Sequence, residues 1–164
     1  MDQFPILVLT TGGTIDKNYF DALSEYQIVD SGIPALLKEA RVALPFRIEE
    51  VCRKDSLELT GEDRAEIARR AAEAPETRIV ITHGTDTMTE TAKALAGVAG
   101  KTIVLTGALS PARFAETDAP FNLGMAFAAA QTAAPGVYIA MSGQVFDGLK
   151  VRKDREAGQF VAAI

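Results

Sequence analysis

The chain has 164 residues, of which 48% are hydrophobic and 24% are charged, and its formal net charge is −5. This length and composition suit one compact domain with a sizeable core. The acidic balance, without a dense cluster of Lys and Arg, argues against nucleic acid or an anionic membrane surface as a partner. Cys52 is the only cysteine, which excludes an internal disulfide framework and any cysteine-based metal site, and favours a reducing compartment.

Targeting and membrane-spanning segments are not evident. No apolar run approaches the roughly 18 residues that a transmembrane helix needs. The first residues also lack a basic region followed by an apolar stretch and a cleavage site, the pattern of an export signal. We therefore expect a cytoplasmic protein.

The first predicted element is a strand at residues 6–9, Ile-Leu-Val-Leu, whose uncharged run is typical of a strand buried on both faces. It leads into Thr10-Thr11-Gly12-Gly13-Thr14, where two glycines allow close backbone approach and three threonines supply hydroxyls. Ligands of open α/β sheets bind at the carboxyl ends of the strands, so this turn is a candidate site. Alternatively, its threonines only satisfy backbone groups. The glycines match neither the dinucleotide nor the P-loop pattern, which argues against a nucleotide site.

The next stretch predicts a loop, a helix and a strand. Residues 17–30 are polar and irregular but carry aromatic residues, which indicates either a lid over the turn at Thr14 or a small hairpin. A helix is expected over about residues 32–41, with proline in its first turn. A strand follows at residues 46–52 and ends in a polar turn at residues 53–56. Thr60 and Asp63 predict an N-terminal cap for a helix that ends at Glu73.

The second half of the chain repeats this alternation. Strands are expected at residues 79–81, 102–105 and 137–141, and helices from about residue 88 to 96 and from 123 to 132. Thr87 and Glu90 suggest a second capping pattern. Strands and helices that alternate in this way predict an α/β fold with a doubly wound, mainly parallel sheet, a flavodoxin- or Rossmann-like three-layer domain. Residues 144–147 and 151–153 are expected to pair around Gly148 as a C-terminal hairpin.

Two predicted strands end in hydroxyl-rich turns. The second turn is Thr82-His83-Gly84-Thr85-Asp86-Thr87. If both strands are central and parallel, the turns face the same edge of the sheet, which brings Thr14 and Thr85 into one crevice. A threonine hydroxyl is a poor nucleophile at neutral pH and needs a neighbouring base. Asp86 lies beside Thr85, and a lysine serves this purpose when burial and a hydroxyl partner lower its pKa.

The same two segments carry a resemblance to a known family. Thr11-Gly12-Gly13-Thr14-Ile15, followed about 70 residues later by Ile81-Thr82-His83-Gly84-Thr85-Asp86-Thr87-Met88, resembles the two signature segments of bacterial-type L-asparaginases. Further similarity lies at Gly107-Ala108 with Pro111, at residues 118–123, and at Phe146-Asp147-Gly148 followed by Lys153. The likeness covers almost the whole chain but only the amino-terminal domain of the usual two-domain subunit. It implies a short, one-domain asparaginase over residues 1–164.

The resemblance implies roles for individual residues. Thr14 matches the nucleophile that attacks the side-chain amide carbon, and Tyr26 is similar to the lid tyrosine that assists it. Thr85, Asp86 and Lys153 match a second catalytic group, in which the lysine acts through the threonine. Ser56 aligns with the serine that binds the substrate α-carboxylate, and backbone N–H groups near Thr85 and Ala108 would stabilise an oxyanion. The substrate-binding positions implied are Gly13, Asp55, Ser56, Leu57, Gly84, Thr85, Asp86 and Ala108.

Two departures from the family pattern affect substrate binding. Leu57 stands where many members have a polar residue that contacts the substrate amino group, which implies weaker binding and a preference for asparagine over glutamine. The family also takes an acidic residue for the ammonium from a neighbouring subunit's carboxyl-terminal domain, which the resemblance does not cover here. We expect weaker affinity or a replacement carboxylate from another protomer. The resemblance also implies a homo-oligomer.

Several candidate residues have a plain structural alternative. His83 is the only histidine, and a single histidine at a strand end is more often structural than catalytic. Lys153 and Asp154 are interpretable as a solvated charge pair, although the Asp-Gly-x-x-x-x-Lys spacing favours a function for Lys153. Tyr26 is compatible with an anchoring role without chemistry.

Three functions compete on this evidence. The first is an L-asparagine amidohydrolase that forms L-aspartate and ammonia without metal or cofactor. The second is an amino-acid-binding or regulatory module that has lost turnover. The third is an amidotransferase component that acts with tRNA partners, which the acidic composition disfavours.

Overall fold

The computed structural model describes residues 5–20, 25–28 and 30–163, with only the backbone described at residues 19, 20, 25, 26 and 28. The strands are β1 (Ile6–Gly12), β2 (Lys17–Phe20), β3 (Glu25–Ile28), β4 (Phe46–Lys54), β5 (Arg78–Thr82), β6 (Thr102–Thr106), β7 (Gly136–Met141), β8 (Gln144–Asp147), β9 (Val151–Asp154) and β10 (Gln159–Ala162). The helices are α1 (Ile33–Glu39), α2 (Gly61–Glu73), α3 (Met88–Ala94) and α4 (Ala119–Thr132), with short 3₁₀ helices at Thr14–Asp16 and Ser56–Glu58.

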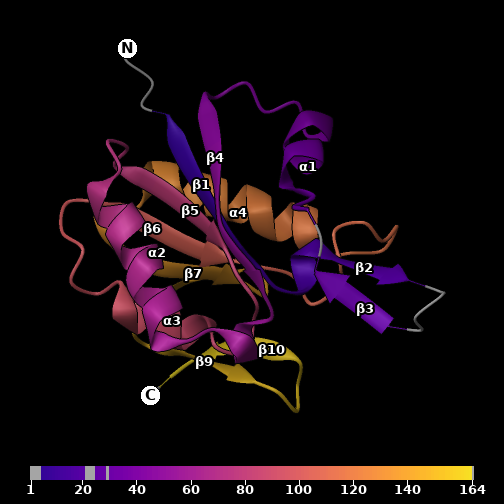
Figure 1. The fold of residues 1–164 in the computed structure, drawn as a ribbon. Helices are drawn as coiled ribbons and strands as arrows, with labels where there is room; N and C mark the ends of the chain where they lie inside the picture. Colours follow the sequence, from indigo (N-terminus) through magenta and orange to yellow (C-terminus); the bar gives the residue numbers. More distant parts are fainter. Residues whose placement is uncertain (1–4, 21–24, 29, 164) are drawn as a thin grey trace.

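One six-stranded sheet forms the centre of the molecule, in the order β4-β1-β5-β6-β7-β8 (Figure 1). All neighbouring strands are parallel except β7 and β8. The expected α/β fold with a doubly wound, mainly parallel sheet is therefore confirmed. Thr10 of β1 pairs with Thr82 of β5, and Thr82 pairs with Thr106 of β6. The carboxyl ends of these three strands thus lie level at one edge of the sheet.

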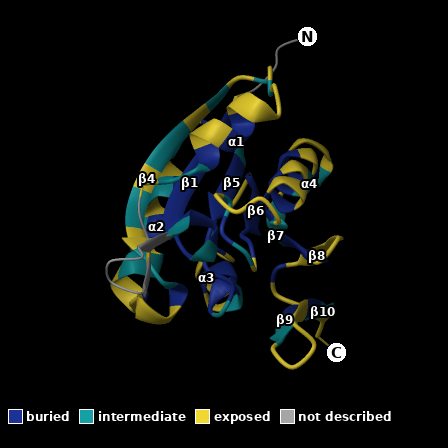
Figure 2. Ribbon diagram, turned by 90° about the vertical axis from the view of Figure 1, so that its right-hand side faces the viewer, coloured by how far each residue is buried: buried dark blue, intermediate teal, exposed yellow. Residues whose placement is uncertain are grey.

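The strand residues alternate between two buried layers because successive side chains point to opposite faces. Ile6 and Val8 of β1 pack in the layer that includes α1 and α4. Leu7 and Leu9 pack in the opposite layer with α2 and α3. Figure 2 shows the buried strands between these two layers of helices. The apolar run at residues 6–9 therefore has the two-sided burial that its composition predicts.

The C-terminal hairpin has different strands from those expected. Residues 144–147 do not pair with residues 151–153: β8 returns along β7, and β9 pairs with β10. Ser142 and Gly143 join β7 to β8 with φ values of 54° and 74°, and positive φ at both central residues is the geometry of a tight two-residue hairpin. The prediction was wrong because Ser-Gly is a weak signal for such a turn, whereas Gly148 is a conspicuous one.

The two predicted helix caps have different outcomes. At the start of α2, Thr60 and Asp63 form a reciprocal capping box, as expected. At the start of α3, Thr87 makes no side-chain cap hydrogen bond. Its hydroxyl instead donates to the carbonyl of Ser56 at 2.8 Å. The second cap was therefore wrong, because a tertiary partner competes for the same hydroxyl.

Residues 17–30 contain a small hairpin, the alternative that the sequence left open beside a lid over the turn at Thr14. β2 and β3 pair antiparallel, with Tyr19 opposite Tyr26, and the hairpin projects from the body of the domain (Figure 1). At its base, Asp16 is buried and accepts hydrogen bonds from the Ser31 hydroxyl at 2.9 Å and from the Gly32 amide at 3.2 Å. The lid interpretation depends on the Tyr26 side chain, which lies outside the described part of the structure.

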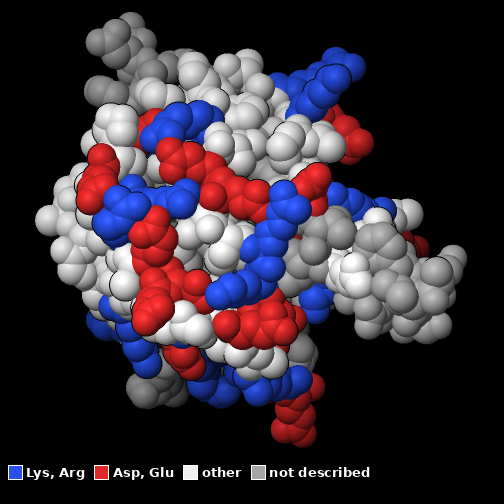
Figure 3. Space-filling model, in the orientation of Figure 1, with Lys and Arg blue, Asp and Glu red and all other residues white. Residues whose placement is uncertain are grey.

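The visible surface carries mixed charge. Figure 3 shows acidic and basic side chains interleaved over the face that displays α2 and β4, rather than a field of one sign. Among the described residues, no helix has the length and apolar character needed to cross a membrane.

A buried threonine pair at the strand ends offers a test of hydrogen-bond energetics. Thr11 donates its hydroxyl to the Thr82 carbonyl at 2.8 Å, whereas the buried Thr82 hydroxyl has no hydrogen-bond partner among the described residues. We expect Thr82→Val to be neutral or to stabilise the fold by up to about 1 kcal/mol, because it removes an unpaired polar group. Thr11→Val should cost about 1 kcal/mol. Urea unfolding measures both, and an equal loss in the two variants would contradict this prediction.

Candidate active site

Glycines bring three strand-end turns into direct contact. A Cβ at Gly13 would overlap the backbone of Gly84, and one at Gly84 would lie 2.6 Å from the Cβ of Ser56. Gly13 also has a φ of 88°, which glycine adopts without strain. Thr14 directly follows Gly13, and Thr85 directly follows Gly84. The structure therefore brings together the turns that carry both threonines, as the parallel strands predict.

Lys153 reaches this site from the C-terminal hairpin. Its Nζ lies 2.8 Å from the Thr85 hydroxyl oxygen and 2.8 Å from Oδ1 of Asp86. The Lys153 side chain is only 17% exposed. Phe160, opposite Lys153 in the strand pairing and 2% exposed, anchors the hairpin in the core. Lys153 thus contacts the two residues with which its predicted role associates it, and not its neighbour Asp154.

The Ser56 turn forms the next wall of the site. Asp55 caps this turn by accepting the Leu57 amide at 3.1 Å, and it pairs with Lys17 at 3.0 Å. Ser56 is buried, and its hydroxyl oxygen accepts the Thr87 amide at 3.3 Å. No acceptor for the Ser56 hydroxyl hydrogen is found among the described residues, so this hydrogen remains available to a bound anion.

Charges of alternating sign surround the site. Asp86 lies between Lys153 and Arg155, whose Nε is 3.7 Å from Oδ1 of Asp86. Burial alone would raise the pKa of Asp55, but hydrogen bonds from the Leu57 amide and Lys17, together with the charges of Lys17 and Lys153, lower it. The Asp55 carboxylate therefore stays charged at neutral pH.

His83 is fully buried beneath the Thr85 turn. Its Nδ1 lies 2.6 Å from the Gly84 carbonyl and its Nε2 lies 2.7 Å from the Thr91 hydroxyl. The pKa of His83 is lowered to about 4, mainly by burial and to a smaller extent by the Arg64 charge, against the opposing effect of the Gly84 hydrogen bond. A carbonyl only accepts, so the neutral ring carries its hydrogen on Nδ1 and accepts from Thr91 at Nε2. Both ring nitrogens are thus used within the fold.

The turn after β6 closes the site from the other side. A Cβ at Gly107 would overlap the His83 carbonyl oxygen, so this turn packs directly on the Thr85 segment. Asn122 of α4 donates to the Gly107 carbonyl at 2.9 Å. Ala108 is 1% exposed, and its backbone follows this fixed glycine. The position of Ala108 is therefore set by the packing of two strand ends.

The remaining predicted site residues have different placements. Thr14 is half-buried at the start of its 3₁₀ helix, and no hydrogen bond joins its hydroxyl to Lys153 or Thr85 among the described residues. Leu57 is 67% exposed, at the open side of the Ser56 turn. The Tyr26 side chain is not described.

Sequence reasoning missed several residues of the site. Lys17 pairs with Asp55, and Arg155 lies beside Asp86. Thr87 contacts Ser56, and Thr91 contacts His83. Arg64 contacts both of these threonines. One usable signal was the spacing of Thr87 and Thr91, since residues i and i+4 lie on one face of a helix.

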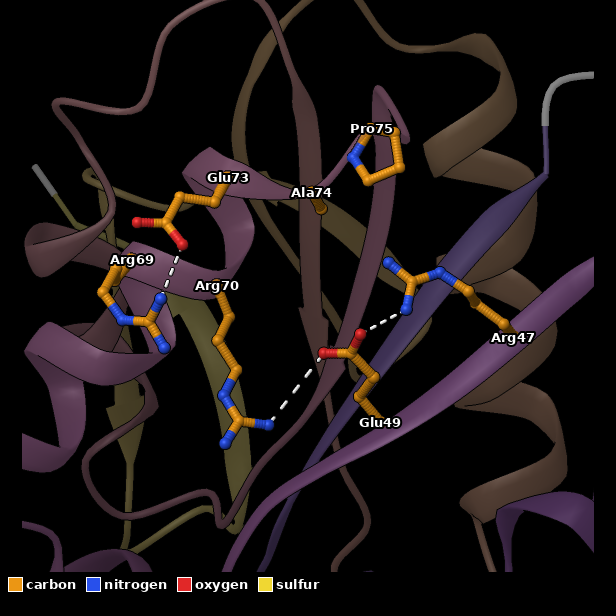
Figure 4. Close-up of a pocket in the computed structure, with 7 residues that line it drawn as sticks. All are labelled: Arg47, Glu49, Arg69, Arg70, Glu73, Ala74 and Pro75. Atoms are coloured by element: carbon orange, nitrogen blue, oxygen red, sulfur yellow. Dashed lines mark hydrogen bonds and ion pairs between the residues drawn. The ribbon is translucent and has the colours of Figure 1, made fainter.

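A second charged region lies away from this site. The groove in Figure 4 is lined by Arg47, Glu49, Arg69, Arg70, Glu73, Ala74 and Pro75, contributed by β4, by α2 and by the residues that follow α2. Its arginines are paired, for example Arg69 with Glu73. None of the predicted site residues lines it. Within the described residues, no cluster of three or more His, Cys, Asp or Glu has a metal-binding arrangement.

Comparison with known proteins identifies relatives of this chain. The chain is 34% identical over 163 residues to an L-asparaginase of Thermococcus kodakarensis, covering 93% of this chain and 48% of that protein. It is 33% identical over 168 residues to a component of the glutamyl-tRNA(Gln) amidotransferase of Methanococcus vannielii, covering 90% of this chain and 38% of that protein. The solved structure of L-asparaginase I from Vibrio cholerae superposes with a TM-score of 0.86 at 26% identity, covering 98% of this chain and 52% of that one.

The chain thus spans about half or less of the length of these relatives. The family model described as "Asparaginase, N-terminal" matches residues 5–159, which include the Gly13, Gly84 and Lys153 segments that meet at the site. The chain therefore belongs to the asparaginase family, through the domain that forms the amino-terminal part of its members.

Proposed function

We propose that this protein hydrolyses L-asparagine to L-aspartate and ammonia through an acyl-enzyme on Thr14. The observation that carries the proposal is the contact of Lys153 with Thr85 and Asp86 beside the packed Gly13 and Gly84 turns. Membership of the asparaginase family supports amide hydrolysis as the reaction class. The reaction needs no metal or cofactor, because a hydroxyl nucleophile and a base suffice for acyl transfer.

The first half of the reaction is an attack by the Thr14 hydroxyl oxygen on the side-chain amide carbon of asparagine. The hydroxyl proton passes to a base, a role that we assign to Lys153 acting through Thr85, with Tyr26 assisting at Thr14. Backbone N–H groups near Thr85 and Ala108 stabilise the oxyanion. The tetrahedral intermediate collapses, the carbon–nitrogen bond breaks, and the nitrogen leaves as ammonia with the transferred proton.

The second half returns the enzyme to its starting state. Water attacks the acyl carbon, gives a proton to the same Lys153 and Thr85 pair, and displaces Thr14, which recovers its hydroxyl hydrogen. Before substrate binds, the Nζ of Lys153 lies 2.8 Å from Oδ1 of Asp86. Binding of the substrate ammonium at Asp86 competes with this contact and releases the lysine for its role as a base.

Substrate recognition uses the Ser56 turn and Asp86. The free hydroxyl hydrogen of Ser56 is suited to the α-carboxylate, and Asp86 is suited to the α-ammonium. Asp86 already contacts Lys153 and Arg155, so a second carboxylate would strengthen ammonium binding. We propose that it comes from another protomer of a homo-oligomer. The single, unpaired Cys52 supports a reducing, cytoplasmic location.

Leu57 predicts weak recognition of the substrate amino group. Its side chain is exposed at the Ser56 turn and offers no hydrogen bond. We expect glutamine turnover far below asparagine turnover, and we expect Leu57→Gln to lower the KM for asparagine by about threefold to tenfold, the effect of one added hydrogen bond. Steady-state kinetics with both amides test this. Equal turnover of the two amides by the parent protein would contradict the prediction.

An amino-acid-binding module is the second candidate function. It is favoured by the buried Ser56 turn and by Asp86, which suit the α-carboxylate and the α-ammonium of an amino acid whether or not turnover follows. The similarity to an amidotransferase component suggests a third function, as part of an amidotransferase that acts with tRNA partners. The interleaved charges of the visible surface do not favour binding to tRNA.

Ammonia release from millimolar L-asparagine decides between hydrolysis and binding. The intact protein is assayed beside a heat-denatured sample, and its melting temperature is measured with and without L-aspartate. Release by the folded protein alone supports the hydrolase. No release, with a melting temperature that aspartate still raises, supports the binding module.

A further inference from the structure

Arg64 of α2 lies beneath the site and contacts neither Thr14 nor Lys153. Its side chain is 13% exposed. Nη2 donates to the Thr87 hydroxyl at 2.9 Å, and Nε donates to the Thr91 hydroxyl at 3.3 Å. Nη1 donates to the Leu59 carbonyl at 3.2 Å. One guanidinium therefore joins two threonines at the start of α3 to the segment that follows the Ser56 turn.

One branch from Arg64 leads to Ser56. The Thr87 hydroxyl accepts from Arg64, and its own hydrogen goes to the Ser56 carbonyl at 2.8 Å. The Thr87 amide also donates to the Ser56 hydroxyl oxygen. This second contact occupies a lone pair of Ser56 and leaves its hydroxyl hydrogen for a ligand. The branch thus fixes both the backbone and the side-chain orientation of Ser56.

The other branch leads to Gly84. The Thr91 hydroxyl accepts from Arg64 and donates to Nε2 of His83, because the neutral ring has no hydrogen there. Nδ1–H of His83 then donates to the Gly84 carbonyl. Every hydrogen bond in both branches runs outward from the guanidinium, and hydrogen bonds that share one direction polarise and strengthen one another.

We propose that Arg64 is a positioning residue of the active site: through Thr87 and Thr91 its guanidinium holds the Ser56 and Gly84 turns in the spacing that substrate binding requires. This inference rests on the proposed function. The two turns touch, since a Cβ at Gly84 would lie 2.6 Å from Ser56, so a shift in either one moves the other. The planar fork of arginine reaches two hydroxyls at once, which a lysine ammonium does not reproduce with the same geometry.

Kinetics of Arg64→Met and Arg64→Lys test the proposal, with Arg69→Met as the matched control. Arg69 lies on the same helix and pairs with Glu66 and, as Figure 4 shows, with Glu73. We expect Arg64→Met to lower kcat/KM for asparagine by about tenfold, mainly through KM, because the turns remain but are held less firmly. Arg64→Lys should recover only part of this loss, and Arg69→Met should leave kcat/KM unchanged.

A double-mutant cycle separates positioning from a loss of stability. In a Thr87→Val, Thr91→Val background, Arg64→Met should have a much smaller effect on kcat/KM, since only the contact of Arg64 with the Leu59 carbonyl remains. An unchanged kcat/KM in Arg64→Met, or the same loss in both backgrounds, would overturn the proposal. Circular dichroism checks the fold, and if Arg64→Met does not fold, Arg64→Lys and Thr87→Val replace it in the cycle.

Two activity-independent measurements keep this test distinct from that of the proposed function. L-aspartate affinity is measured by calorimetry, and the imidazole of His83, the only histidine, is followed by NMR. If the intact protein releases no ammonia, the proposed function fails, while a weaker aspartate affinity in Arg64→Met with an upward shift of the His83 titration still supports positioning. Unchanged affinity together with an unchanged titration would refute it.

Discussion

Replacing Thr14 by alanine is expected to lower kcat for ammonia release from L-asparagine by at least about a thousandfold, because it removes the proposed nucleophile. The side chain stands at the start of a short 3₁₀ helix and makes no hydrogen bond that holds the fold together among the described residues. The melting temperature should therefore change little. Thr132→Ala, at the far end of α4, is the control and should retain full activity.

The same assay applies to the base. Lys153→Met and Thr85→Val are each expected to lower kcat by about 10² to 10⁴, the usual contribution of a positioned acid or base. Their effects should not add in the double variant, because the lysine is proposed to act through the threonine. Lys150→Met, in the exposed turn between β8 and β9, is the matched control. A Lys153→Met enzyme with parental kcat would exclude lysine as the base.

Acidification is expected to destabilise the fold through His83. Its pKa is lowered to about 4 in the folded protein, mainly by burial, against an ordinary value of about 6.5 in the unfolded chain. The unfolded state therefore binds more protons between these two values. The stabilisation is present in full above about pH 6.5 and is lost as the pH falls toward 4, with a total of about 3 kcal/mol.

Urea unfolding at pH 7 and pH 5 measures this effect. We expect the free energy of unfolding to fall by about 2 kcal/mol between these pH values. His83 is the only histidine, so no other side chain has an ordinary pKa in this interval. A His83→Gln variant should be less stable at pH 7 and should lose most of this pH dependence. A parental slope in that variant would show that another group is responsible.

The lowered pKa also bears on the proposed mechanism. A buried, neutral His83 with both nitrogens engaged cannot exchange protons with a ligand without breaking the connection between Thr91 and Gly84. Catalytic activity that depends on a group with a pKa near 6.5 would therefore not be explained by His83 in its observed place.

Local patterns determined much of the fold and the location of the candidate site. The uncharged run at residues 6–9 predicted a strand buried on both faces, and the alternation of strands and helices predicted a doubly wound sheet; both are observed. The two threonine-rich turns were expected at one sheet edge, because parallel central strands end on the same side. Such predictions succeed because the hydrophobic pattern of a strand or helix lies within a short stretch of the sequence.

Tertiary structure decided what depends on partners far away in the chain. Thr87 had the pattern of a helix cap, but the Ser56 carbonyl, 31 residues earlier, takes its hydroxyl. Gly148 had the pattern of a hairpin turn, but β8 pairs with β7 and β9 pairs with β10. No local sequence pattern indicated a role for Arg64, since its contacts are with two threonines at the start of another helix. A polar group takes the partner that packing brings within reach, and packing depends on the whole fold rather than on the local sequence.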